Sequence, residues 1–166
     1  MNAFNCKLIS TFSADRVYRV FLVPEGTFFI QIGGQNLGHA MAMHFGLLGG
    51  LVYSAIEKRS RAKLEQRIQK LDFVHPSAYL GSGKHNFHAM NSDVEISILQ
   101  PRARYRGHGP HCGRWIFKAR GQKQMTFELE TPGDMQKAYD LLGAAIAVHA
   151  NKVVWNPSRS TFTALP

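Results

Sequence analysis

A long helical pattern interrupts a chain that otherwise consists of predicted short strands. Before the interruption, three segments rich in β-branched and aromatic residues are separated by turn-forming residues, and they cover 5–12, 17–23 and 27–33. From residue 36 to about residue 71 the apolar residues follow a helical spacing instead. Strand-like segments resume farther along the chain. The protein therefore has to build one sheet from strands that lie on both sides of a helical insertion.

Four more strands are predicted in the C-terminal half. They are HNFHAM at 85–90, VEISILQ at 94–100, GRWIFKA at 113–119 and QMTFELE at 124–130. The last two form a predicted hairpin, and QMTFELE alternates apolar with polar residues, which is typical of a strand with one face on a core. We expect residues 72–84, which contain one proline and two glycines, to be the loop that returns from the insertion.

The clearest helix signal follows the last strand. Thr131 is a predicted N-cap, Pro132 occupies the first helical position and Asp134 lies in the first turn. A helix is predicted from about 132 to 150, with an apolar stripe that packs on the completed sheet. The stripe consists of Met135, Ala138, Tyr139, Leu142, Ala145, Ile146 and Val148. We expect the tail, 151–166, to lie back along the body.

This order gives seven strands and a final amphipathic helix, with an insertion after the third strand. Together with FFIQIGGQ before the insertion, KHNFHAM after it and GRWIFKARGQKQMTFELETPGDMQKAYDLL at the end, it resembles the pleckstrin-homology-like domain of uncharacterised bacterial proteins. The resemblance covers roughly 17–33 and 85–150. It implies an α+β fold, a seven-stranded antiparallel barrel capped by the C-terminal helix. The chain would then be one domain over 1–166, with the helical insertion and return loop at 36–84 between strands 3 and 4.

The resemblance also bears on function. Domains of this family are similar in shape but bind phosphoinositides, peptides or other proteins, so it implies an interaction module. Lipid-binding members usually carry basic residues between the first two strands. Here that loop, 13–16, holds one acid and one base, which does not favour inositol-phosphate binding.

Within the insertion, every fourth residue from 38 to 54 is small. This small-residue ladder consists of Gly38, Ala42, Gly46, Gly50 and Ser54, in a run that is almost free of charge. A helix with this spacing has a smooth groove along one face, which a neighbouring helix or a bilayer can fill. We predict that the ladder mediates self-association into a homo-oligomer. Packing on its own domain and contact with a membrane remain alternatives.

A simple membrane crossing by the ladder is disfavoured. The run is about 20 residues long, which is enough to span a bilayer. A single crossing, however, would place the first three strands and the last four on opposite sides of the membrane, and the sheet could not close. Only a helix that enters and leaves on one side, or lies on the surface, would preserve the fold.

The chain turns basic directly after the apolar run, at Lys58, Arg59, Arg61 and Lys63. Such a charged helix face is most often solvated. The alternative is an electrostatic contact with an anionic membrane surface, which would make the protein a peripheral membrane protein.

A second basic stretch, 102–123, contains no acidic residue. Its first three arginines, Arg102, Arg104 and Arg106, occupy alternate positions, so an extended conformation would present them together. With nearby aromatic residues for base stacking, nucleic-acid binding is a further alternative. No recognition helix or RNA-binding aromatic signature accompanies these residues, so nucleic acid is the less favoured partner.

Composition indicates the class of protein but does not identify a binding partner. The chain has 166 residues, a net charge of +9 and 45% hydrophobic residues, which is typical of one folded basic domain. It contains two cysteines, Cys6 and Cys112, with no CxxC motif and no predicted signal peptide. We expect a cytoplasmic protein, with membrane association as an alternative. Whether the cysteines pair is left open.

The sequence suggests three kinds of chemical motif, and none of them is complete. His108, His111 and Cys112 are metal-ligand types, but two of them are adjacent, which is awkward for one tetrahedral site. Residues 78–85 superficially fit a phosphate-binding loop, but His85 replaces the hydroxyl that would hold magnesium. No Ser-His-Asp or Cys-His arrangement has support. We predict a non-enzymatic protein with no metal, no cofactor and no small-molecule substrate.

Overall fold

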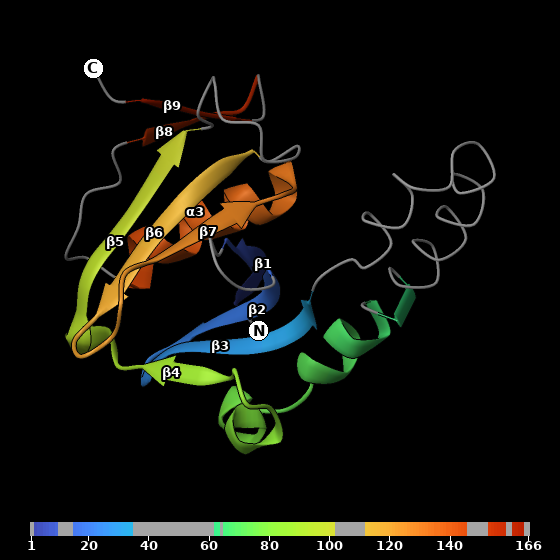
Figure 1. The fold of residues 1–166 in the computed structure, drawn as a ribbon. Coiled ribbons are helices and arrows are strands. Elements are labelled where there is room, and N and C mark those ends of the chain that lie inside the picture. The colour runs from blue at the N-terminus through green and yellow to red at the C-terminus, as the bar shows by residue number, and fades with distance from the viewer. Residues whose placement is uncertain are drawn as a thin grey trace, which may run out of the picture.

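The computed structural model describes residues 2–9, 15–34, 62–63, 65–101, 112–145, 153–158 and 161–164. Seven strands in these ranges form one antiparallel sheet in the order β4-β3-β2-β1-β7-β6-β5 (Figure 1). Their bounds are Ala3–Leu8 for β1, Arg16–Val23 for β2, Gly26–Gly34 for β3, Phe87–Ala89 for β4, Val94–Pro101 for β5, Gly113–Ala119 for β6 and Met125–Leu129 for β7. The seven predicted strands and the α+β class are confirmed. The first strand begins two residues earlier than predicted.

The sheet curls on itself into a partly open barrel. The strands that come first and last in the chain, β1 and β7, pair with each other, with Lys7 opposite Glu128 and Leu8 opposite Phe127. Its two edges, β4 and β5, are consecutive in the chain and are joined by η2, a short 3-10 helix at Asn91–Asp93. A flat sheet would hold these edges far apart. The short link of residues 90–93 therefore requires the curl that brings β5, β6 and β7 across the other strands (Figure 1).

The β2–β3 turn depends on glycine. The predicted turn at 24–26 is present, and Val23 pairs with Gly26 across it. Gly26 has a φ of +152°. A side chain at this position would collide with the Ala89 carbonyl oxygen and the His88 ring on β4. Only glycine fits both the backbone angle and the close approach of the neighbouring strand.

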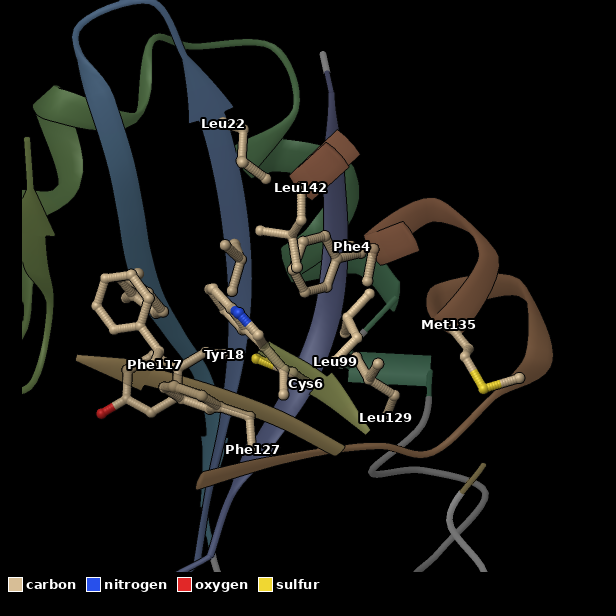
Figure 2. Packing of buried hydrophobic residues seen from close by; sticks show 14 of the residues in the cluster. Phe4, Cys6, Tyr18, Leu22, Leu99, Phe117, Phe127, Leu129, Met135 and Leu142 are labelled. Atoms are coloured by element: carbon tan, nitrogen blue, oxygen red, sulfur yellow. The ribbon is translucent and has the colours of Figure 1, made fainter. Parts of the chain in front are cut away.

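The inner face of the curled sheet encloses an aromatic core. Figure 2 shows side chains of the β1–β2 and β5–β7 strands and of the C-terminal helix pointing into it. Trp115, Phe29 and Phe127 stack on one another with ring centroids 5.3–5.6 Å apart. The Trp115 indole N–H donates to the Ser97 hydroxyl at 3.0 Å. The interior of this small barrel is therefore filled by side chains. We refer to it as the inner core.

The C-terminal helix, α3 at Pro132–Ala145, closes the inner core where the sequence predicted. The Thr131 hydroxyl accepts a hydrogen bond from the Asp134 amide at 3.0 Å, as an N-cap does. The Asp134 carboxylate in turn accepts one from the Asn5 amide at 2.8 Å, which ties the helix to β1. Met135, Ala138 and Leu142, three residues of the predicted stripe, are buried against the sheet.

A second cluster covers the opposite face of β1–β3. Its buried members are Ala3, Phe21, Phe28, Ile30, Ile32 and Leu71. They are covered by helical residues 65–71 and by η1, a 3-10 helix at Pro76–Ser82 within the predicted return loop. We call this the outer cluster. It packs the described end of the insertion against the sheet (Figure 1).

The tail contains a hairpin that the sequence pattern did not predict. Strands β8, Val153–Asn156, and β9, Thr161–Ala164, pair with each other and contact β5. Val153 is buried in the inner core. The tail is therefore part of the packed body.

Candidate functional site

An ion pair fixes the described end of the insertion to the sheet. Arg19 lies on β2 with only 7% of its surface exposed. Its guanidinium donates to both carboxylate oxygens of Asp72, with Nη2 2.8 Å from Oδ2 and Nε 3.1 Å from Oδ1. It also donates to the Asn5 side chain at 3.1 Å and lies over the Phe21 ring. Since Asp72 directly follows the 65–71 helix, this pair and the outer cluster hold that helix in place.

The two ends of the insertion lie side by side. The chain leaves the sheet at Gly34, the end of β3. It is back beside β3 at Arg67, whose Nη1 lies 3.5 Å from the Ile32 carbonyl oxygen. The residues at which the chain leaves β3 and returns to it therefore lie close together. Within the ranges given above, no helix has the length and hydropathy to cross a bilayer.

Most of the predicted site residues lie outside the described residues. This holds for the whole small-residue ladder of Gly38, Ala42, Gly46, Gly50 and Ser54, and for Lys58, Arg59, Arg61, Arg102, Arg104 and Arg106. Lys63 is described, and it is helical and exposed. The self-association and anionic-surface predictions therefore stay predictions.

The described part of the second basic stretch is largely neutralised. Three of its four described basic residues face carboxylates. Arg114 lies 3.0 Å from Glu128, Arg120 lies 3.8 Å from Asp93, and Lys118 pairs with Glu95. Lys118 lowers the pKa of Glu95 by hydrogen bonding and by its charge. These cations therefore offer little net attraction to a nucleic-acid backbone.

A polar recess opens beside the end of β3. It has a volume of about 250 Å³ and is lined by Gln31, Gly33, Gly34, Arg67, Gly83 and Asn86. Strand β4 pairs with β3 only as far as Phe29, so none of the described strands lies beside the following residues of β3 on this edge. The Asn86 side chain takes that place, because its Oδ1 accepts the Gln31 amide hydrogen at 2.8 Å.

The charge around the recess is positive. Partial burial lowers the pKa of His85, and the positive charges of Arg16 and Lys84 lower it further. Arg16 stands opposite Gly34 in the β2–β3 pairing. None of the described residues that line the recess is acidic. The sequence analysis did not predict this site, because its residues come from three distant segments. The only local signals are the glycine pair at 33–34 and Gly83.

The two cysteines do not form a disulfide with each other, because they lie too far apart. Cys6 lies in β1 and Cys112 directly precedes β6, with β7 between these strands. Strands two positions apart are separated by roughly 9.5 Å, and a disulfide needs Cα atoms within about 7 Å. Burial raises the pKa of the Cys6 thiol, and the charges of Asp134 and Glu130 raise it further. The thiol therefore stays protonated and is unsuited to nucleophilic chemistry.

Two other chemical motifs do not become sites in the described residues. His108 and His111 lie outside those residues, and within them no group of three or more His, Cys, Asp or Glu residues is placed to hold a metal ion. Residues 76–82 form η1 and the chain then enters β4. A phosphate-binding loop of the kind considered at 78–85 would lead into a helix instead.

We compared the chain with known proteins at three levels. No family model, no curated protein and no solved structure matches it.

Proposed function

We propose that the chain is a pleckstrin-homology-like interaction module that does not act as an enzyme and that self-associates through its insertion. The strand order, the curl of the sheet and the helix α3 that caps it support the resemblance. The interior is filled by aromatic side chains, so partners have to bind on the surface.

The side-by-side anchoring of the insertion supports the mode of association. Both faces of β1–β3 are already covered, the inner one by the inner core and the outer one by Ile68, Leu71, Tyr79 and Leu80. A helix with the small-residue ladder requires a close-packing partner. A second copy of the chain supplies an identical ladder for it, and symmetric pairing of equal surfaces is the commonest form of association.

The test substitutes two residues of the small-residue ladder. Gly46→Leu combined with Gly50→Leu should reduce the oligomer to the mass of one chain in light scattering, because leucine fills the groove. The matched control is Gly143→Leu. Gly143 lies in helix α3, is exposed, and has open space where a side chain would begin. An unchanged mass in a folded double variant would sink the self-association proposal.

A membrane surface is the second candidate, and one observation favours it. Phe73 is 85% exposed two positions after the 65–71 helix, whose basic residues are Arg67 and Lys70, and the next residue, Val74, is 44% exposed. Exposed apolar residues beside a basic helix are typical of surface-bound membrane proteins. This candidate predicts that the chain co-sediments with anionic vesicles and that binding weakens as salt rises.

A further inference from the structure

We propose that the recess beside the end of β3 binds an oxyanion of the phosphoryl class, with Arg67 as its principal charged ligand. The recess is large enough for such a group, at about 250 Å³, and the described residues that line it are all neutral or basic. This inference goes beyond the proposed function, because it concerns a different part of the molecule.

The Arg67 guanidinium has N–H donors that a ligand can use. Its guanidinium carries five N–H donors, and one of them reaches the Ile32 carbonyl oxygen at 3.5 Å. No carboxylate among the described residues pairs with it. By contrast, Lys7, Arg19, Arg114, Lys118 and Arg120 each lie against a carboxylate. Within the part of the chain that the structure describes, Arg67 is therefore a cation with no carboxylate partner, and it lies at a hollow in the surface.

The glycines of the recess allow a ligand to approach the backbone. Gly33, Gly34 and Gly83 present main-chain groups with no side chain in the way, as anion-binding backbone sites do. A Cβ at Gly83 would lie 3.0 Å from the Asn86 side-chain nitrogen, and one at Gly34 would lie 3.6 Å from that of Gln31. Side chains at these positions would therefore occupy or distort the hollow.

Asn86 is a positioning residue and not a ligand. Its Oδ1 accepts from the Gln31 amide, and its Nδ2 donates to the Tyr79 carbonyl oxygen at 2.6 Å and to the Ser82 hydroxyl at 3.4 Å. Its hydrogen-bonding groups are thus engaged with protein. They hold residues 83–86 at a fixed separation from β3, which sets the width of the recess.

The surrounding charge favours an anion. Arg16 and Lys84 both act on His85, the residue two positions after Gly83, and together with partial burial they lower its pKa. A bound oxyanion would oppose these charges and stabilise the imidazolium. The pKa of His85 should therefore rise when the recess is filled, which provides a reporter close to the site.

The test is a titration with inorganic phosphate at constant ionic strength, followed by NMR. We expect shifts of the Gly33, Gly34 and Gly83 amide signals and a rise in the pKa of His85. Arg67→Gln should lower the phosphate affinity by about tenfold or more, because it removes charge-assisted hydrogen bonds. The control is Arg120→Gln, which changes the net charge equally but removes a cation that faces Asp93.

Two results would overturn the site. One is an equal loss of affinity in Arg67→Gln and Arg120→Gln, which would mean attraction by net charge alone. The other is the absence of glycine amide shifts up to phosphate concentrations on the order of 10 mM. Vesicles with and without phosphatidic acid separate the two sources of the ligand. Binding that requires phosphatidic acid and is lost in Arg67→Gln identifies a lipid headgroup, whereas the phosphate response without vesicle binding identifies a free phosphoryl compound. The mass in light scattering is a separate measurement, so failure here leaves the self-association test intact.

Discussion

The two faces of the β1–β3 sheet are covered in different ways. The inner face packs into an aromatic core that draws on β5, β6, β7 and α3, elements from the far end of the chain. The outer face carries the smaller outer cluster, which the insertion covers, and the Arg19–Asp72 ion pair. The inner core thus closes the barrel, whereas the outer cluster attaches the insertion to it. Damage to the first should unfold the whole domain, and damage to the second should release only the attachment.

The largest expected effect is that of Trp115→Ala on the inner core. Trp115 is fully buried and contacts Phe4, Phe29, Phe117 and Phe127. Its removal should lower the free energy of unfolding by about 3–5 kcal/mol, through lost burial and the cavity that remains. Chemical denaturation followed by circular dichroism measures it.

A milder variant and a surface control keep this prediction testable. Trp115→Phe should fold and lose less, because it mainly leaves the buried Ser97 hydroxyl without its donor. Met90→Ala, at a residue that is 52% exposed, should change stability by less than about 0.5 kcal/mol. If Trp115→Ala unfolded at the same denaturant concentration as Met90→Ala, the inner core would not be what closes the barrel.

The inner core and its strands could be predicted from the sequence, because their signals are local. Segments rich in β-branched and aromatic residues predict the first three strands, Pro24 and Gly26 predict a turn, and Thr131 with Pro132 predicts the start of α3. The prediction for the first strand, 5–12, begins two residues late and extends beyond Leu8, where β1 ends. The tail hairpin was missed, although Pro157 between two β-branched runs is a turn signal.

The outer cluster and the recess could not be predicted in the same way. Arg19 and Asp72 are 53 positions apart, and neither has a neighbouring pattern that reveals the other. The recess joins the end of β3, the returning helix and residues 83–86, so it exists only after the chain has folded back. Glycine pairs gave a weak hint, but a glycine pair alone is equally typical of a turn.

An intermediate effect on stability is expected from Arg19→Met, which removes the ion pair on the outer face. Methionine keeps the apolar stem but leaves the Asp72 carboxylate without its main partner. Because Asp72 is one-third exposed, water recovers part of the loss, and the cost should be about 1–3 kcal/mol. Hydrogen exchange should show faster exchange of amides in 65–71, with the β6 amides unchanged.

A second substitution sharpens this result. Adding Asp72→Asn to Arg19→Met removes the uncompensated charge and should restore part of the stability, since the two residues contact each other. Equal loss of protection in β6 and in 65–71 would contradict the comparison, because it would make the outer cluster as essential to the fold as the inner core.

The smallest effect on stability is expected from Phe73→Ser, at the exposed end of the returning helix. Phe73 is 85% exposed, so its substitution should change the free energy of unfolding by less than about 0.5 kcal/mol, although Leu71, two residues before it, is buried in the outer cluster. The informative measurement is co-sedimentation with anionic vesicles. If the membrane candidate is correct, Phe73→Ser should weaken vesicle binding while thermal unfolding stays unchanged, because an exposed phenyl ring adds affinity for the bilayer interface and little for the fold. A loss of stability comparable to that of Arg19→Met would instead place Phe73 within the outer cluster and remove the observation on which the membrane candidate rests.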